Sequence, residues 1–280
     1  MIRLVAKPVV DEIKATLAKK VSEIKQRRGR APKLVVVLVG DDPASVIYTT
    51  KKGDIAQQLG IDHETLKFPA NATPEEVRAA VQNLNVNNSV DGILIQRPLP
   101  KTFKETEVLY WVSPNKDVDA FHPENTGRLV LGLSCFQPCT PAGVVRLLKH
   151  YSIPFEGKIA CVVGRSSIVG KPMAAMLLKE NCTIIQCHSK TANLSSLTCQ
   201  ADLVVAAAGK PGLVGSSFIK DGAIVVDVGI HRTTSGKLIG DVLFDEVAPK
   251  TSAITPVPGG IGPMTIALLM ENTVRAAEIQ

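Results

Sequence analysis

Residues 159–189 read IACVVGRSSIVGKPMAAMLLKENCTIIQCHS, which is an apolar run, a turn with two glycines, a helical stretch and a second apolar run. The alternation continues through LVVAAAG at 203–209 and AIVVDVG at 223–229, and a last helical stretch follows. Short apolar runs that alternate with helices are typical of parallel sheets covered by helices on both faces. The pattern therefore predicts a Rossmann-type domain in the C-terminal half of the chain.

The turn after the first apolar run carries Gly164 and Gly170. A turn that leads from a strand into a helix aims backbone N–H groups and the positive helix end at a phosphate. The glycines are spaced G-x-x-x-x-x-G and not G-x-G-x-x-G, so the motif alone is a weak signal. Glycines that only let strand and helix pack closely remain the alternative interpretation.

The residues after the second apolar run indicate which dinucleotide would bind. An NAD-binding unit normally places an acidic residue about 20 residues after the turn, where it binds the ribose 2′-hydroxyl. Here that place holds Cys187, His188, Ser189 and Lys190, and Arg165 directly follows the first glycine. Hydroxyl and cationic groups suit a 2′-phosphate, which a carboxylate would repel. The sequence therefore favours NADP over NAD.

The N-terminal half has the same α/β character. The run KLVVVLV at 33–39 is continuous and rich in valine, as expected for a strand covered on both faces. TPEE at 73–76 has the form of a capping box that opens a helix, and GILIQ at 92–96 forms a further strand. Ligands of such domains usually bind beyond the carboxyl ends of the strands. We therefore expect the functional residues just after the apolar runs.

Composition narrows the class of protein. The 280 residues suit roughly two domains, and the net charge of +6 favours capture of anions such as nucleotide phosphates. Seven Phe, three Tyr and one Trp form no interleaved basic and aromatic run, which argues against a nucleic-acid platform. The six cysteines lack metal-binding spacing, so we expect free thiols in a reducing cytoplasm and no metal. The opening MIRLVAKPVVDEIK is too charged for a signal peptide or a membrane span.

Four polar residues are candidates for the chemistry. Tyr48 and Lys52 are four residues apart in a helical stretch, so they project from one face of the helix. Gln96 ends the strand GILIQ, and Asp119 lies in the polar loop NKDVDAFHPENTG. Taken alone, a half-buried ring beside a solvated amine and a solvated acidic turn are the ordinary interpretations. No spacing argument unites the four residues.

Eight motifs, in order, make the chain resemble the bifunctional methylenetetrahydrofolate dehydrogenase/methenyltetrahydrofolate cyclohydrolase family over essentially its whole length. They are DDPASVIYTTKKGDIAQQLGI, GILIQRPLP, NKDVDAFHPENTGRL, PCTPAG, VVGRSSIVGKP, CHSKT, DVGI and ITPVPGGIGPMT. The resemblance implies NADP-dependent oxidation of 5,10-methylenetetrahydrofolate, followed by hydrolysis of the methenyl product to 10-formyltetrahydrofolate. Two rival hypotheses are a dehydrogenase without cyclohydrolase activity and a non-catalytic folate- or nucleotide-binding protein.

The family's architecture implies two α/β domains that flank a cleft. A folate-binding catalytic domain would span residues 1–137, with a C-terminal helix over 264–280 packing back on it, and a Rossmann-type NADP-binding domain would span 138–263. A homodimer is also implied only by the resemblance.

The family's motifs also assign roles to single residues. In the pterin pocket Lys52 would be the catalytic amine, held by Gln96, while Tyr48 packs against the folate and Asp119 accepts hydrogen bonds from the pterin. The opposite side of the pocket would be closed by Pro258, Gly259 and Gly260. The resemblance implies NADP contacts from Gly164, Arg165, Ser166, Ser189 and Ile230.

The chemistry is consistent with these roles. Hydride transfer needs mainly the methylene carbon held against the nicotinamide ring in near-attack geometry. Hydrolysis needs a group that shuttles protons as the ring opens, and burial together with Gln96 would keep Lys52 partly neutral for that task.

Two positions depart from the family's usual pattern. Arg97 stands where Leu is usual, and Ala120 where Gly is usual. If the backbone at 120 is left-handed, Ala costs on the order of 1 kcal/mol there. Arg97 is hypothesised to reach a carboxylate of the substrate.

Overall fold

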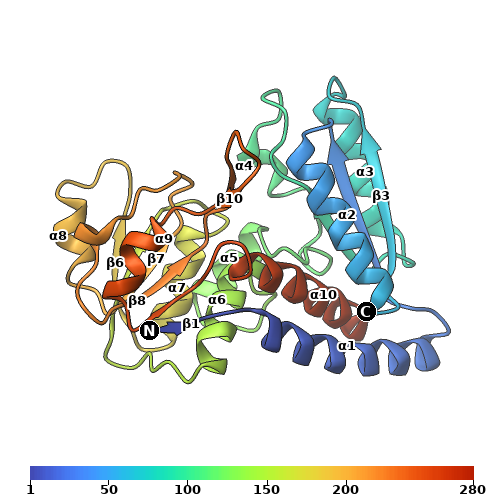
Figure 1. Cartoon of the computed structure of the whole chain (residues 1–280). Coiled ribbons are helices and arrows are strands. Elements are labelled where there is room, and N and C mark those ends of the chain that lie inside the picture. Colours follow the sequence, from blue (N-terminus) through green and yellow to red (C-terminus); the bar gives the residue numbers. More distant parts are fainter. The chain divides into compact units, whose positions relative to one another are not determined.

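The computed structural model describes residues 1–280 and divides into two compact units (Figure 1). The six-stranded unit contains Met1–Asp11, Leu129–Leu133 and Pro138–Thr265, and the three-stranded unit contains Glu12–Arg128, Ser134–Gln137 and Ile266–Gln280. Both units are α/β, which confirms the predicted fold class and its Rossmann-type sheet. The predicted assignment of folate to residues 1–137 and of NADP to residues 138–263 stays a prediction.

The strands are β1 (Ile2–Arg3), β2 (Lys33–Val39), β3 (Asp62–Phe68), β4 (Gly92–Ile95), β5 (Ile159–Val163), β6 (Thr183–Cys187), β7 (Leu203–Ala206), β8 (Ile224–Asp227), β9 (His231–Arg232), β10 (Leu238–Ile239) and β11 (Ala253–Ile254). The α-helices are α1 (Lys7–Arg28), α2 (Pro43–Gln58), α3 (Pro74–Val86), α4 (Glu105–Val108), α5 (Pro123–Val130), α6 (Cys139–His150), α7 (Gly170–Lys179), α8 (Leu194–Thr198), α9 (Phe244–Val247) and α10 (Ile261–Ile279). Two short 3₁₀ helices are η1 (Ser216–Phe218) and η2 (Ala248–Lys250).

The three-stranded unit is a parallel sheet in the order β3-β2-β4. Since β3 and β4 lie on opposite sides of β2, right-handed connections place α2 and α3 on opposite faces of the sheet (Figure 1). Both faces of β2 are therefore covered, which explains its continuous apolar sequence. The predicted capping box is confirmed: Glu76 N donates to Thr73 Oγ1 at 3.2 Å, and Thr73 N donates to Glu76 Oε2 at 2.8 Å.

The six-stranded unit has a parallel sheet in the order β1-β11-β8-β7-β5-β6. The chain leaves β5 for β6 on one side and later returns to β7 on the other side, so strand order reverses between β5 and β7. This reversal is the topological switch point at which open α/β sheets bind their ligands. The fold itself therefore points to the carboxyl ends of β5 and β7.

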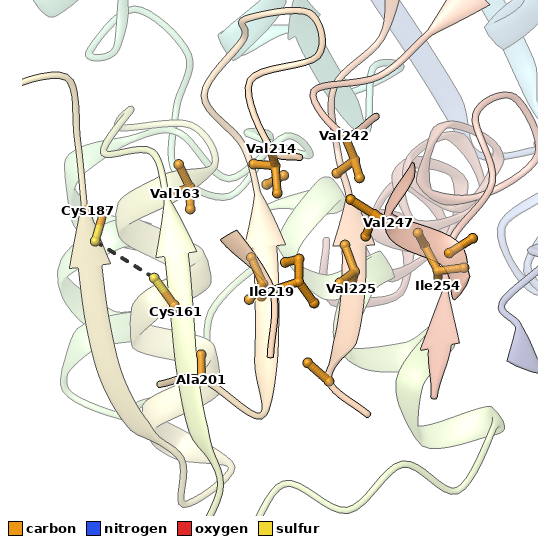
Figure 2. Packing of buried hydrophobic residues seen from close by; sticks show 14 residues of the cluster. Cys161, Val163, Cys187, Ala201, Val214, Ile219, Val225, Val242, Val247 and Ile254 are labelled. Carbon is orange, nitrogen blue, oxygen red and sulfur yellow. Dashed lines mark hydrogen bonds between the residues drawn. The ribbon is translucent and has the colours of Figure 1, made fainter. Parts of the chain in front are cut away.

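The core of this unit contains residues from adjacent strands on one face of the sheet (Figure 2). Figure 2 shows Cys161 of β5 and Cys187 of β6 pointing toward each other, and their Sγ atoms are 3.8 Å apart. Burial raises the pKa of the Cys161 thiol, which keeps it protonated and unreactive. These cysteines pack as small apolar side chains, as the sequence predicts.

The two-residue strands β1, β9, β10 and β11 escaped prediction. β1 pairs in parallel with β11, with Ile2 opposite Ala253, so the first residues of the chain join the six-stranded sheet. Both of its residues are exposed and the strand is very short, so no apolar pattern marks it. None of the helices combines the length and the apolar character that crossing a bilayer requires.

Candidate functional site

Lys52 and Gln96 meet in the three-stranded unit. α2 begins at Pro43, where Asp42 accepts a hydrogen bond from Ser45 N, and it places Lys52 on its buried side with only 8% exposure. Gln96 directly follows β4 at the carboxyl end of the sheet. Lys52 Nζ donates to Gln96 Oε1 at 2.8 Å. Tertiary structure thus joins two candidates that sequence spacing did not connect.

The orientation of the Gln96 amide is fixed from its other end. Gln96 Nε2 donates to the carbonyl oxygen of Arg97 at 2.6 Å, which leaves Oε1 facing the lysine. An acceptor held in this way restrains the Lys52 amine to one position. A restrained amine is what proton transfer to a bound substrate requires.

Tyr48 lies one helical turn before Lys52 and is half-buried. Burial raises the pKa of the Tyr48 phenol, so at neutral pH the side chain is an uncharged hydrogen-bond donor with an apolar ring. These properties suit a residue that packs against a planar ligand.

Asp119 lies in the loop between α4 and α5 and is half-buried. The neighbouring Asp117 is only 5% exposed, and its Oδ2 accepts from His122 N at 2.7 Å and from Asn125 Nδ2 at 3.0 Å. Asp117 thereby ties the loop to the start of α5. Asp117, Asp119, Arg97 and Phe121 also line one small cavity of about 20 Å³.

The buried Asp117 makes stability depend on pH. Burial raises its pKa to about 6, so the folded protein binds this proton more tightly than the unfolded chain. The resulting stabilisation is full below the ordinary carboxyl pKa and is lost as pH rises through 6. We expect the stability advantage of wild type over Asp117→Asn to shrink by about 1 kcal/mol between pH 5 and pH 7. Urea unfolding of both proteins at pH 5 and pH 7 measures this difference in the free energy of unfolding. A difference that stays the same at both pH values would contradict the raised pKa of Asp117.

Ala120 adopts the left-handed conformation that glycine favours, with φ of 61°. The departure from the family's glycine therefore falls where a Cβ is strained. Ala120→Gly is expected to raise the free energy of unfolding by up to about 1 kcal/mol, because relief of strain exceeds the entropy that glycine adds to the unfolded chain. Chemical denaturation measures this change in the free energy of unfolding. The control is Ala142→Gly inside α6, which should destabilise the protein because glycine is unfavourable inside a helix. A loss of stability at both positions would rule out strain at Ala120.

Arg97, the other departure, already has partners in the protein. Its guanidinium forms an ion pair with Glu105 at 3.0 Å and lies 5.8 Å from the centre of the Phe121 ring. Both interactions hold the side chain beside the loop that carries Asp119. Contact between Arg97 and a substrate carboxylate stays a hypothesis.

The six-stranded unit has a cavity of about 430 Å³ at the switch point between β5 and β7. Residues that follow β5, β6 and β7 line it, and they include four of the predicted NADP contacts: Gly164, Arg165, Ser166 and Ser189. The cavity also receives Lys210, a cation that the sequence had not singled out as a ligand. Cationic and hydroxyl groups around one cavity fit a phosphate-bearing dinucleotide.

Backbone geometry explains both glycines of this turn. Gly164 has φ of 144°, and a Cβ there would collide with the Ala207 carbonyl oxygen of the neighbouring strand end. A Cβ at Gly170 would collide with the Gly164 carbonyl group. Close packing thus accounts for the glycines, and it also opens the cradle in which a phosphate approaches backbone. Both interpretations of the turn apply together.

Ser166 has a local role that sequence did not predict. Its hydroxyl accepts hydrogen bonds from Val169 N and Gly170 N, both at 3.2 Å, at the start of α7. Two N–H groups expected to face a phosphate are therefore capped within the protein. The predicted contact of Ser166 with NADP stays a prediction.

The remaining predicted contacts lie outside this cavity lining. Ile230 follows β8 and is 40% exposed, while Pro258, Gly259 and Gly260 precede α10 in the six-stranded unit. Ile230 is adjacent to a buried group that sequence reasoning missed, in which Asp241 contacts His231 and the loop after β7. The sequence did carry a signal for this group: Asp241 stands inside the apolar stretch LIGDVLF, and an aspartate is buried in such surroundings only when it has partners.

Comparison with known proteins identifies the relatives of this chain. Two family models match: the catalytic domain of tetrahydrofolate dehydrogenase/cyclohydrolase over residues 4–119 and the NAD(P)-binding domain of the same family over residues 138–280. The bifunctional protein FolD of Campylobacter curvus is 50% identical over 271 residues, which cover 95% of this chain and 94% of that protein.

Solved structures agree with the sequence relatives. The bifunctional enzyme FolD, methylenetetrahydrofolate dehydrogenase/cyclohydrolase, of Campylobacter jejuni is similar with a TM-score of 0.96 and 48% identity, covering 100% of this chain and 99% of that one. The N5,N10-methylenetetrahydrofolate dehydrogenase-cyclohydrolase of Trypanosoma brucei, complexed with NADP cofactor and inhibitor, has a TM-score of 0.95 and 33% identity, covering 100% and 98%. Because these matches span nearly the whole chain at high identity, it belongs to the tetrahydrofolate dehydrogenase/cyclohydrolase family that the eight motifs predict.

Proposed function

We propose that this chain oxidises 5,10-methylenetetrahydrofolate to 5,10-methenyltetrahydrofolate with NADP⁺ and hydrolyses the product to 10-formyltetrahydrofolate. Membership of a bifunctional family supports both steps. The observation that carries the cyclohydrolase step is the hydrogen bond of 2.8 Å between the buried Lys52 amine and Gln96. The cavity at the switch point supports binding of the dinucleotide.

In the first step the chain's residues bind and orient the reactants. NADP⁺, when bound, would supply the acceptor for the hydride of the substrate's methylene carbon. Asp119 accepts hydrogen bonds from the N–H groups of the pterin, and the half-buried ring of Tyr48 packs against it. No protein acid or base is needed in this step, because positioning supplies the catalysis.

In the second step Lys52 moves protons. Water adds to the electrophilic methenyl carbon and forms a C–O bond, and the neutral Lys52 amine accepts one proton from that water. The bond from this carbon to the ring nitrogen then breaks, and the Lys52 ammonium returns its proton to that nitrogen. The second proton of the water leaves to solvent as the formyl carbonyl forms. Gln96 keeps the amine within reach throughout.

The identity of the dinucleotide is part of the proposal. Arg165 and Ser189 line the cavity where the chain leaves β5 and β6, and no acidic side chain belongs to the lining. A ribose 2′-phosphate is attracted to such a group of side chains, whereas the NAD ribose lacks its usual carboxylate partner. This arrangement supports NADP.

The test is an assay of the purified protein with 5,10-methylenetetrahydrofolate and either NADP⁺ or NAD⁺, in which reduced cofactor and both folate products are quantified. NADP⁺-dependent reduction with 10-formyl product is the expected result. Methenyl product that accumulates and decays only at its spontaneous rate would indicate a dehydrogenase alone. Absence of turnover with either cofactor would indicate a binding protein and overturn the proposal.

A homodimer and a cytoplasmic location complete the proposal. The dimer is supported by resemblance to the family, and light scattering should give the mass of two chains. The location is supported by six free cysteine thiols, which persist in a reducing compartment.

A further inference from the structure

Asp241 is a carboxylate with no exposed surface that links two loops of the six-stranded unit. Its Oδ2 accepts hydrogen bonds from Ala208 N at 2.7 Å and from Gly209 N at 2.8 Å. Its Oδ1 lies 2.7 Å from Nε2 of His231. A buried carboxylate is tolerated only with such partners, and bonds to an ionised acceptor are stronger than neutral ones.

The three partners of this carboxylate lie at the carboxyl ends of adjacent strands. Ala208 and Gly209 belong to the loop after β7, and Ala208 lines the cofactor cavity. His231 begins β9, directly after the predicted NADP contact Ile230 and four residues after Asp227, where β8 ends. One side chain therefore fixes the loop after β7 relative to the loop after β8.

The anchor is itself held rigidly. Asp241 N donates to Oδ1 of Asp227, the last residue of β8, at 2.9 Å, and Val242 N donates to Asp227 Oδ2 at 2.9 Å. A Cβ at Gly229 would collide with the Asp241 carboxylate, and one at Gly240 would collide with the Asp227 carboxylate. The glycines thus admit the two carboxylates and leave Asp241 little freedom to move.

The position of these loops indicates which half of the dinucleotide they face. A dinucleotide spans the switch point between β5 and β7. Ser189, the proposed partner of the 2′-phosphate, follows β6 on one side of β5. The nucleotide that carries the 2′-phosphate therefore lies on that side, and the other nucleotide extends over the ends of β7 and β8. That other nucleotide carries the reactive nicotinamide.

We propose that Asp241 is a positioning residue for the dehydrogenase reaction, which sets the two loops that hold the nicotinamide nucleotide. The inference rests on the proposed function, because it concerns the NADP of that reaction. Asp241 acts through Ala208, Gly209 and His231 and does not itself touch the reacting atoms.

The test compares Asp241→Asn with wild type by direct titration of NADP⁺ binding, followed by separate measurement of both activities. The amide keeps the size of the side chain but loses the charge and one accepting atom. We expect the Kd for NADP⁺ to rise about tenfold or more and the dehydrogenase kcat to fall, because two loops lose a charge-assisted anchor. Cyclohydrolase activity, assayed from the methenyl substrate without cofactor, should stay within about twofold, because Lys52 lies in the three-stranded unit.

Asp202→Asn is the matched control in the same unit. Asp202 also binds backbone through its carboxylate, with Ile159 N donating to Oδ2 at 2.8 Å, but it lies at the amino ends of the strands. It should lower thermal stability without changing NADP⁺ affinity. Equal effects of Asp202→Asn and Asp241→Asn on the Kd, or an equal loss of cyclohydrolase activity in Asp241→Asn, would overturn the inference.

His231→Ala tests the same link if Asp241→Asn does not fold. His231 is only half-buried, so its removal should be tolerated, and a rise of about threefold in the Kd for NADP⁺ is expected from loss of one hydrogen bond. An unchanged Kd would argue that Asp241 serves stability alone. If wild type itself fails to bind NADP⁺, the proposed function fails and the inference falls with it. If wild type binds NADP⁺ but the variants bind it equally well, only the inference about Asp241 fails.

Discussion

Lys52→Gln is expected to abolish cyclohydrolase activity above the spontaneous hydrolysis of methenyltetrahydrofolate. The amide is polar but uncharged and one bond shorter than the lysine side chain, and it does not take up and return protons near neutral pH. General acid–base groups contribute about 100-fold to 10,000-fold, so a loss in this range follows if Lys52 is the shuttle. The measurement is the decay of the methenyl substrate with pure variant, corrected for the rate without protein.

Lys51→Gln controls for the change of charge. Lys51 directly precedes Lys52 in α2 and is exposed, so its substitution should have no effect on hydrolysis. Folate binding by Lys52→Gln should persist, because Tyr48 and Asp119 remain. Hydrolysis by Lys52→Gln at the wild-type rate would show that another group moves the protons.

Arg165→Gln is expected to reduce the preference for NADP⁺ over NAD⁺ about 100-fold. A charge-assisted bond from a guanidinium to the 2′-phosphate contributes about 1.5–3 kcal/mol, and each 1.4 kcal/mol is a factor of ten. The kcat/KM with NADP⁺ should fall while that with NAD⁺ changes little. Steady-state kinetics with both cofactors measures the ratio.

Lys179→Gln controls for the general loss of positive charge, because Lys179 is exposed at the far end of α7 from the turn. It should leave the ratio unchanged. Equal losses with NADP⁺ and NAD⁺ in Arg165→Gln would mean that Arg165 contacts a part common to both cofactors, and that the selectivity comes from Ser189.

Sequence predicted the regular elements wherever local patterns are strong. The valine run became β2 with the predicted bounds, and the capping box at Thr73 opens α3 as predicted. β1 was missed, because a strand of two exposed residues depends entirely on its pairing with β11. The predicted helix over 264–280 in fact begins at Ile261, which shows how little the sequence says about where a helix starts without a cap signal.

The candidate site was predicted less evenly. Motifs marked Lys52, Gln96 and the residues of the cofactor cavity, and the resemblance implied that Gln96 holds Lys52, but residue spacing gave no reason for the two side chains to touch. The capping role of Ser166 and the link made by Asp241 could not be predicted from the sequence. Each depends on hydrogen bonds from backbone N–H groups, which nearly every residue type has, so no residue type marks them.

By itself, the sequence determined the α/β class and the family, and it gave the reason to propose NADP, since these depend on local periodicity, ordered motifs and the missing carboxylate after β6. Tertiary structure supplied the hydrogen bond between Lys52 and Gln96 that the resemblance implied, and it alone decided that the ends of β5 and β7 enclose one cavity and that Asp241 joins two loops. The physical reason is that parallel pairing brings together strand ends that are distant in sequence. Only the folded backbone sets their register, and with it the distances on which hydrogen bonds depend.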